Sequence, residues 1–151
     1  MAEVTIVRPI TSRPAAISLT AERLTEVTLG VVRIVVGFLF ACHGAQKLFG
    51  AFGKAPIAIG TWPSWWAGVI EFAAGGLIVL GLFTRPAAIL CSGSMAYAYF
   101  TVHQAAGALP LQNKGELAAL YSWIFLLIAI VGPGALAVDA VRRRNAQSSK
   151  Q

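Results

Sequence analysis

Four long apolar runs occupy most of this 151-residue chain and constrain its fold more than any other feature. A helix needs roughly 20 apolar residues to cross a hydrocarbon core about 30 Å thick, so the chain has room for about four such helices and little else. Hydrophobic residues make up 57% of the sequence and charged residues only 12%, which leaves too little polar surface to enclose a water-soluble core. The sequence therefore predicts an integral membrane protein with no soluble catalytic domain.

The apolar runs are continuous and rich in Leu, Ala and Gly instead of alternating with polar residues, so they predict helices. The predicted fold class is all-α, an integral membrane four-helix bundle within a domain at residues 27–141. The expected spans are residues 27–49, 63–83, 86–103 and 116–131. Small residues in the first two spans should let those helices approach closely, namely Gly37, Gly44, Gly68, Gly75 and Gly76.

Basic residues predict the orientation of the bundle. The turn at residues 84–86 is so short that it makes the second and third spans antiparallel neighbours. If both termini are cytoplasmic, eight Lys and Arg residues lie on the inner side, and three lie on the outer side: Lys47, Lys54 and Lys114. Arg33, the remaining one of the twelve Lys and Arg residues, lies within the first span. The positive-inside rule thus predicts an N-in, C-in multi-pass protein of the cytoplasmic (plasma) membrane.

The two ends of the chain are less apolar than its middle. Residues 1–26 predict a flexible cytoplasmic segment and not a cleavable signal peptide, because the first apolar run starts late and is too long. After the fourth span, residues 132–134 (Gly-Pro-Gly) predict a break. Residues 135–141 then either form a short interfacial helix or continue the fourth span as a kinked helix. Residues 142–151 are predicted to be a basic cytoplasmic tail.

Charged or titratable side chains fall inside the first two apolar runs: Arg33, His43 and Lys47 in the first, and Glu71 in the second. Charge inside a bilayer needs a partner, a wet cavity or a route to the interface. Counted from Phe49, Lys47 lies about 3 Å deep and Arg33 about 24 Å deep, so each can extend towards its own interface. His43 and Glu71 lie about 9 Å and 12 Å from the outer side and cannot. We expect Glu71 to pair with His43 or Arg33.

Helical phase predicts a common face for these side chains. His43 and Lys47 are four residues apart, and Arg33, Phe40 and Lys47 repeat every seven, so the first span should turn this side towards the bundle. The sequence therefore predicts an intramembrane polar network or ligand site formed by Arg33, His43, Lys47 and Glu71. Its pocket should be lined by residues of the same outer half: Phe40, Tyr97, Phe100, His103 and Tyr121.

Three segments of the chain contain these polar residues and the Gly-Pro-Gly break: RIVVGFLFACHGAQKLF at residues 33–49, EFAAGGLIVLGLFTRPAA at 71–88 and GPGALAVD at 132–139. They resemble the DoxX family of small four-helix membrane proteins. They follow the family pattern of an Arg, then His-Gly-x-x-Lys-Leu-Phe, a Glu before Gly-Leu-x-Thr-Arg, and a terminal Gly-Pro-Gly. The resemblance covers nearly all of the predicted membrane domain. It implies that Arg33, His43, Lys47 and Glu71 are the family's polar set.

Relatives within this family include the membrane subunit of a thiosulfate:quinone oxidoreductase and proteins linked to thiol and oxidative stress. The resemblance thus implies a membrane subunit or anchor of a redox complex. It implies a quinone or a small anionic sulfur compound as candidate ligand, and a soluble or membrane oxidoreductase as candidate partner. A non-catalytic scaffold, whose polar residues fix the helix register, accounts for the same residues. A third alternative is a small-molecule transporter formed by a homo-oligomer. Whether the chain is itself an enzyme stays open.

Other kinds of site have little support in the sequence. No spaced motif such as Cys-x-x-Cys or His-x-x-x-His is present, so no metal site is predicted. The net charge of +6 comes from residues that flank the membrane and would face anionic lipid, so it does not indicate nucleic-acid binding. The partner that the sequence does predict is the lipid bilayer.

Overall fold

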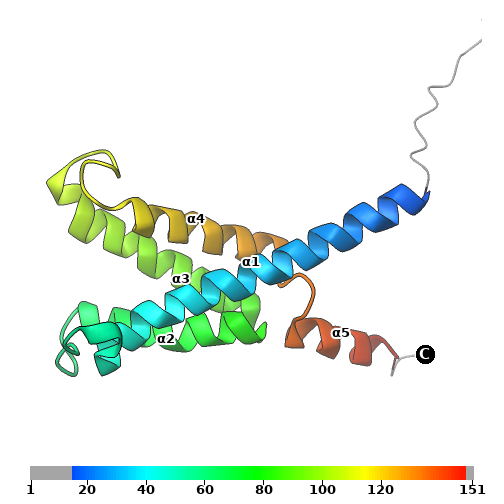
Figure 1. Cartoon of the computed structure of the whole chain (residues 1–151), viewed down its shortest axis with the longest axis horizontal. Coiled ribbons are helices and arrows are strands. Elements are labelled where there is room, and N and C mark those ends of the chain that lie inside the picture. The colour runs from blue at the N-terminus through cyan, green and yellow to red at the C-terminus, as the bar shows by residue number, and fades with distance from the viewer. Residues whose placement is uncertain (1–14, 149–151) are drawn as a thin grey trace, which may run out of the picture.

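A computed structural model of the chain describes residues 15–148, and side chains for residues 19–142 and 148. Within this range the chain forms helices and no strand (Figure 1). The helices are α1 (Ala15–Phe49), α2 (Ser64–Leu80), α3 (Thr84–Ala98), α4 (Glu116–Val131) and α5 (Val138–Ser148). A short 3-10 helix, Ala51–Gly53, follows α1, and α3 continues through a π-helical turn, Tyr99–His103, and a 3-10 turn, Gln104–Ala106. The prediction of an all-α fold is confirmed.

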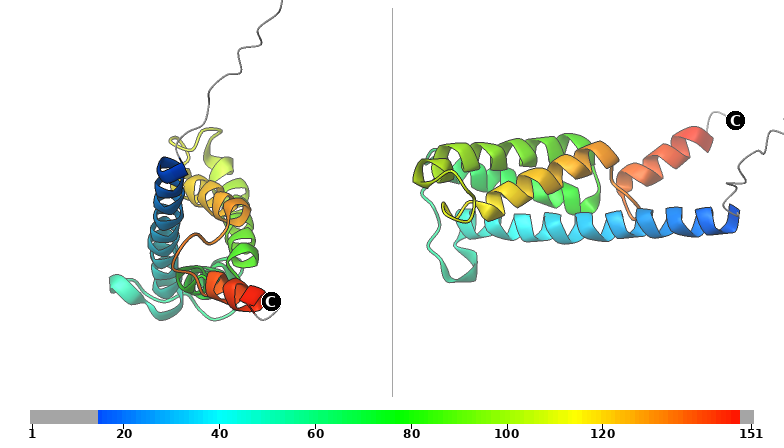
Figure 2. Two further views of the ribbon diagram at one scale, coloured as in Figure 1. Left: turned by 90° about the vertical axis from the view of Figure 1, so that its right-hand side faces the viewer. Right: turned by 90° about the horizontal axis from the view of Figure 1, so that it is seen from above.

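Helices α1 to α4 pack together as a bundle, and α1 extends beyond the others at one end (Figure 2). α1 packs along α2, and α3 packs along α4, while α2 and α3 have a smaller contact. The α1–α2 and α3–α4 connections lie at one end of the bundle, which we call the loop end (Figures 1 and 2). The start of α1 and all of α5 lie at the opposite end, the terminal end.

The helix bounds match the sequence expectations unevenly. α4 has the predicted bounds, and the break at residues 132–134 is followed by a separate helix, so the kinked continuation of the fourth span is wrong. α1 begins at Ala15, so the part of segment 1–26 that the structure describes is helical. α5 also takes in residues 142–148 of the predicted basic tail. Residues 1–14 and 149–151 lie outside the described residues.

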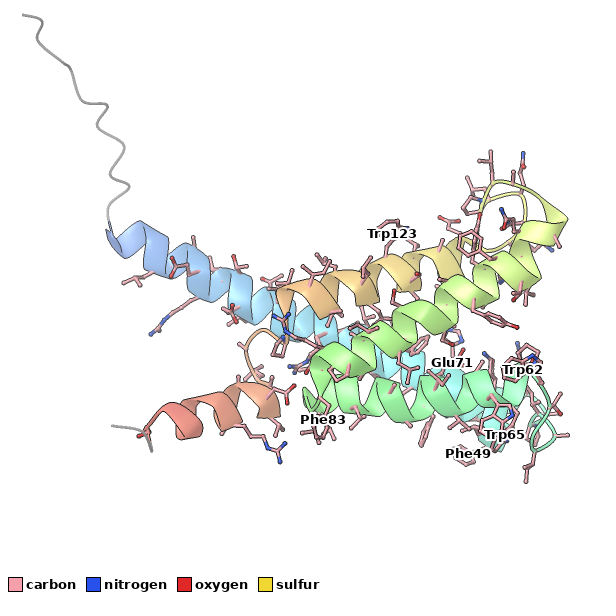
Figure 3. The ribbon with its side chains drawn as sticks, turned by 180° about the vertical axis from the view of Figure 1, so that it is seen from behind. Phe49, Trp62, Trp65, Glu71, Phe83 and Trp123 are labelled. Atoms are coloured by element: carbon pink, nitrogen blue, oxygen red, sulfur yellow. The ribbon has the colours of Figure 1, made fainter. Side chains whose placement is uncertain are left out.

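Judged by length and composition alone, one described helix could cross a membrane. It is Leu19–Phe49, with a mean hydropathy of 1.9. Ser64–Leu80 and Glu116–Val131 are shorter apolar helices. Large apolar side chains also cover the outside of the bundle, among them Phe38, Leu120, Trp123 and Ile130. Figure 3 shows Trp123 pointing away from the other helices, and its side chain is 71% exposed. An apolar outer surface of this kind suits contact with lipid better than contact with water.

The core of the bundle is small and aromatic. Phe40 of α1 and Phe125 of α4 are almost completely buried, and their ring centroids lie 4.7 Å apart in an edge-to-face arrangement. Ile78 of α2 and Cys91 of α3 are also fully buried. All four helices of the bundle therefore contribute to one hydrophobic core.

Glycines let α1 and α2 approach closely, as the sequence predicted for Gly37, Gly44, Gly68 and Gly75. The prediction was wrong for Gly76, where a β-carbon would meet no atom within 4 Å. A β-carbon at position 44 would overlap the backbone nitrogen of Phe72 and lie 2.8 Å from the carbonyl oxygen of Gly68. A β-carbon on Gly75 would lie 2.9 Å from the backbone nitrogen of Ala41. Because these neighbours are backbone atoms, they cannot rotate away as a side chain could.

Replacing Gly44 with Val is expected to separate α1 from α2 and to lower the free energy of unfolding by about 2 kcal/mol, as overpacking of a core does. Thermal unfolding in detergent micelles would measure the change. Gly76→Val is the matched control, since a β-carbon on Gly76 of α2 would meet no atom within 4 Å. Equal stability of the two variants would contradict the close approach.

Candidate functional site

A buried ion pair joins α1 to α2 near the loop end. Lys47 Nζ donates a hydrogen bond to Glu71 Oε1 over 2.5 Å. Glu71 is 2% exposed, whereas the Lys47 side chain keeps 30% of its surface accessible. The second carboxylate oxygen, Glu71 Oε2, is buried and has no hydrogen-bond partner. Because an unsatisfied buried acceptor is costly, this oxygen is an open position for a hydrogen-bond donor.

The ion pair borders a cavity of about 230 Å³ between the helices. Figure 3 shows Glu71 within the bundle, in contrast to the outward-pointing Trp123. We call this space the polar cavity. Its lining comes from all four helices of the bundle and the loop before α4: Phe40, His43, Lys47, Glu71, Met95, Ala98, His103, Lys114, Leu117, Ala118 and Tyr121.

One wall of the polar cavity is aromatic. The Phe40 and Tyr121 ring centroids lie 5.2 Å apart, and Tyr121 stacks on Phe125 at 5.7 Å with an interplanar angle of 14°. The His43 ring meets the Tyr121 ring edge-on at 6.0 Å. The cavity thus combines a carboxylate, an ammonium and an imidazole with flat apolar rings.

The segment between α3 and α4 contributes His103 and Lys114 to the cavity lining, and hydrogen bonds of Asn113 hold this segment together. Asn113 is 5% exposed; its Nδ2 donates to the Gly107 carbonyl over 2.9 Å, and its Oδ1 accepts from the Gly115 N–H over 2.8 Å. The backbone carbonyl of Asn113 lies 3.1 Å from His103 Nδ1. Since a carbonyl only accepts, Nδ1 carries the proton, and Nε2 of a neutral His103 is an acceptor.

A second, larger space of about 570 Å³ lies between α2 and α3 on the outside of the bundle. We call it the α2–α3 groove. Most of its lining is apolar or aromatic and comes from Trp62, Trp66, Ile70, Ile89, Leu90, Tyr97 and Val102, with Gly93 among the smaller residues. Three residues, Lys47, Ala98 and His103, line both the groove and the polar cavity.

Six of the predicted site residues therefore meet at one cavity: Phe40, His43, Lys47, Glu71, His103 and Tyr121. The other three lie elsewhere. Tyr97 lines the groove, where its ring lies 6.2 Å from that of Trp62. Phe100 is 61% exposed and lines neither space. Arg33 lies towards the terminal end of the bundle.

The predicted partners of Glu71 were wrong, since Lys47 bonds to it instead of His43 or Arg33. The physical reason is the close packing of α1 on α2. A β-carbon on Gly68 would lie 2.9 Å from Lys47 Cβ, so the lysine side chain starts against α2. Gly68 and Glu71 are three residues apart on one helix, hence on neighbouring positions of the same face. Lys47 therefore reaches Glu71 instead of extending to the outer interface.

Arg33 holds the segment between α4 and α5. It is fully buried, and its Nη1 donates to the Pro133 carbonyl and its Nη2 to the Leu136 carbonyl, each over 2.9 Å. The Ala135 N–H adds a hydrogen bond of 2.8 Å to the Glu26 carbonyl of α1. The structure thus separates Arg33 from the ligand-site candidates and gives it a role in packing.

Asp139 completes this terminal end by capping α3. Its Oδ2 accepts hydrogen bonds from the Thr84 N–H and hydroxyl, each over 2.9 Å, and its Oδ1 accepts from the Phe83 N–H over 3.1 Å. A carboxylate at a helix N-terminus also interacts favourably with the helix dipole. The Gly-Pro-Gly motif and the Asp after it were visible in the sequence. The sequence did not indicate that this Asp caps α3.

The sequence analysis missed five residues of the cavity lining. Leu117 and Ala118 precede Tyr121 by one turn, and Met95 and Ala98 are three apart on α3, so helical phase could have found these four. Lys114 lies in a loop and carried no such signal. Among the described residues, no group of three or more His, Cys, Asp or Glu side chains could hold a metal ion.

Comparisons with known proteins give one family match and several relatives. The DoxX family profile matches residues 28–104, which include His43, Lys47 and Glu71. An uncharacterized protein of Haemophilus influenzae is 42% identical over 131 residues, covering 78% of this chain and 92% of its own length. The inner membrane protein YqjF of Escherichia coli is 32% identical over 125 residues, covering 78% of this chain and 94% of its own length.

An uncharacterized membrane protein of Mycobacterium tuberculosis is 29% identical over 127 residues, covering 72% of this chain and 77% of its own length. No solved structure matches the chain significantly. Two of the three relatives are named as membrane proteins, and the family profile spans the ion pair and most of the helical bundle. The chain is thus an integral membrane protein and belongs to the DoxX family.

Proposed function

We propose that this protein is a membrane subunit of a redox complex that binds a quinone, and its reduced quinol form, in the polar cavity. The observation that carries the proposal is the buried Glu71 Oε2, which has no donor in the structure. A quinol hydroxyl would donate to this oxygen. When the quinol is oxidised it releases two protons and two electrons. Glu71 accepts one of the protons, Nε2 of the neutral His103 accepts the other, and an oxidoreductase partner accepts both electrons.

A neutral ring suits the cavity better than the small sulfur anion that the family resemblance also implies. The ammonium of Lys47 is already bonded to a carboxylate, so the ion pair has no net charge to offer an anion. The other lysine of the lining, Lys114, is exposed on the loop. Phe40 and Tyr121 supply flat walls against which a planar ring can stack.

In the proposed topology, α1 to α4 all cross the cytoplasmic membrane with the terminal end inside. Two observations support an even number of crossings. The start of α1 and α5 lie at the same end of the bundle (Figure 2). Among the described residues, α5 and the start of α1 carry Arg23, Arg142, Arg143 and Arg144, against Lys47, Lys54 and Lys114 at the loop end. Trp62 and Trp65 lie at the loop end, opposite Phe83, as an interfacial aromatic belt requires (Figure 3). α2 and α4 are about 25 Å long, and local thinning of the bilayer accommodates such lengths.

A non-catalytic scaffold is the second candidate function, and the ion pair itself favours it. A bond between Lys47 and Glu71 fixes α1 against α2 whether or not a ligand binds. In this reading the cavity holds water or lipid, and the open carboxylate oxygen is bonded by water. The two functions differ in whether the site distinguishes the oxidised and reduced forms of a quinone.

Glu71→Gln separates the two functions, because it exchanges an acceptor for a donor at one atom. The glutamine carbonyl keeps the bond to Lys47, and its NH₂ group replaces Oε2. Quinol affinity is expected to fall about tenfold, as loss of one charge-assisted hydrogen bond does. Quinone affinity should stay unchanged or rise, since a quinone oxygen accepts from the new donor. Anaerobic isothermal titration calorimetry in detergent, with ubiquinone-1 and its quinol, measures both.

Glu116→Gln is the matched control, since Glu116 is an exposed carboxylate at the loop end that does not line the cavity. This variant should bind both forms as the unaltered protein does. Failure of the unaltered protein to bind either form would refute the proposal. So would an equal loss of affinity for quinone and quinol in Glu71→Gln together with a lower yield of folded protein, which is the result that the scaffold predicts.

A further inference from the structure

The α2–α3 groove is more than twice as large as the polar cavity, at about 570 Å³ against 230 Å³. It opens on the outer surface of the bundle, where Trp62 is 70% exposed, Ile89 61% and Tyr97 46%. The part of the chain that the structure describes leaves this space unfilled. In a membrane, the surface of such a groove would face the hydrocarbon tails of the bilayer.

The groove adjoins the polar cavity. Lys47, Ala98 and His103 line both spaces, so the two spaces meet at these side chains. A molecule with a polar ring and a long apolar tail could therefore place its ring beside Glu71 and its tail between α2 and α3. The tail would not have to bend back over the loop end of the bundle.

We infer that the α2–α3 groove binds the apolar tail of the quinone, so that the ligand is a long-tailed isoprenoid quinone that reaches the cavity sideways from the bilayer. This inference rests on the proposed function and narrows its ligand class. It excludes short, water-soluble quinones as the main ligand.

The chemistry of the groove favours a quinone tail over a phospholipid. The phosphate of a phospholipid is recognised chiefly by cationic side chains. Lys47 is the one charged residue in the groove lining, and its ammonium is already bonded to Glu71. A quinone tail needs no such side chain, because its polar ring lies in the cavity.

Gly93 offers a way to fill the groove without disturbing the fold. It lies on the exposed side of α3 and lines the groove, and a β-carbon there would meet no atom within 4 Å. A leucine at this position would occupy the space intended for the tail. Gly76→Leu is the matched control, because Gly76 of α2 also faces open space but does not line the groove.

The experiment compares a quinone with a ten-carbon tail, decylubiquinone, and the tailless ubiquinone-0. Both are titrated into the purified full-length protein at one fixed detergent concentration. Because micelles also take up tailed quinones, the compared quantity is the affinity of each variant relative to the unaltered protein. Gly93→Leu is expected to lower decylubiquinone affinity about tenfold and to leave ubiquinone-0 affinity unchanged. Gly76→Leu should change neither.

The outcomes distinguish this inference from the proposed function. If both quinones bind and Gly93→Leu affects neither, the inference is overturned while the proposed function stands. If neither quinone binds the unaltered protein, both fail. If Gly93→Leu instead removes a co-purifying phospholipid and quinone binding is unchanged, the groove is a lipid site and the inference is again overturned. Ala67→Leu, on the α2 wall of the groove, repeats the test should Gly93→Leu fail to fold.

Discussion

Replacing Lys47 with Met is expected to lower the free energy of unfolding by about 3 kcal/mol. Removing one partner of a buried ion pair leaves the other charge without compensation, and the cost is about 3–5 kcal/mol for a fully buried pair. The estimate lies at the lower end because Lys47 retains 30% of its side-chain exposure. Met keeps most of the apolar stem that packs against Gly68, so the change isolates the ammonium.

A second substitution makes this result specific to the ion pair. Adding Glu71→Gln to Lys47→Met should recover most of the lost stability, because a neutral amide does not need a cation beside it. The double-mutant cycle should therefore give a coupling free energy of about 2 kcal/mol between the two positions. Thermal unfolding of the four proteins in detergent micelles provides the cycle.

Lys54→Met serves as the control, since Lys54 is an exposed lysine in the α1–α2 connection. Its stability should stay within about 0.5 kcal/mol of that of the unaltered protein. Additive effects of Lys47→Met and Glu71→Gln would show that the two side chains do not interact in the folded protein. The same result would also contradict the assignment of Glu71 Oε1 to the bond with Lys47 and of Oε2 to a ligand.

The fold was more predictable than its boundaries. The sequence predicted α4 correctly because Gly115 and Gly132 flank a run that is apolar apart from Glu116 and Ser122. It placed the start of α1 too late because it took apolarity as the sign of a helix. Residues 15–26 are polar in part but rich in Ala, Leu, Glu and Arg, which favour helix whatever the surroundings. A helix can thus extend beyond the apolar run that it contains.

The candidate site was predicted best on α1, although Arg33 of the same helix lies outside the cavity. Depth and phase counted along α1 placed Phe40, His43 and Lys47 on one face, and the structure has all three lining the polar cavity. The same count of helical phase wrongly placed Phe100 in the pocket lining. A π-helical turn occupies Tyr99–His103, and its wider winding shifts the phase of the residues within it. Nothing in the composition of that segment distinguishes a π-helical turn from an α-helical one.

The partner of Glu71 depended on a distance between two helices, which no count along one helix contains. Depth alone left His43 and Arg33 as the expected partners of the carboxylate and assigned Lys47, the third basic side chain of this span, to the outer interface. Glycine contacts between α1 and α2 decided among them by bringing the Lys47 stem against Gly68. The sequence did signal close packing through those glycines, but it did not say which pairs of residues would face each other.

Arg33→Met is expected to have the largest effect on stability, a loss of about 4 kcal/mol. The guanidinium is fully buried and donates to two backbone carbonyls, those of Pro133 and Leu136. Hydrogen bonds to a charged group contribute about 1.5–3 kcal/mol each, and the two carbonyls would be left without their donors. The buried Arg33 Nε has no hydrogen-bond partner. Its burial costs free energy in the unaltered protein and offsets part of the stabilisation that the two hydrogen bonds provide.

Arg85→Met provides the comparison for this loss. Arg85 Nη1 donates to the Ala129 carbonyl over 3.2 Å, but the side chain is exposed, so its replacement should cost less than about 1 kcal/mol. Thermal unfolding in micelles measures both variants, and limited proteolysis should cut Arg33→Met between α4 and α5 before the unaltered protein is cut. A similar small loss in both variants would contradict the role assigned to Arg33.

The same variant tests whether the two ends of the bundle are independent. Arg33 does not line the polar cavity, so the fraction of Arg33→Met that remains folded should bind ubiquinone-1 as tightly as the unaltered protein. Binding is measured per folded molecule, at a temperature well below the unfolding transition of the variant. Weaker binding at full folded yield would place Arg33 in the ligand site after all, as the helical phase of α1 alone suggested. Unchanged binding would leave it as the residue that holds the segment between α4 and α5 against α1.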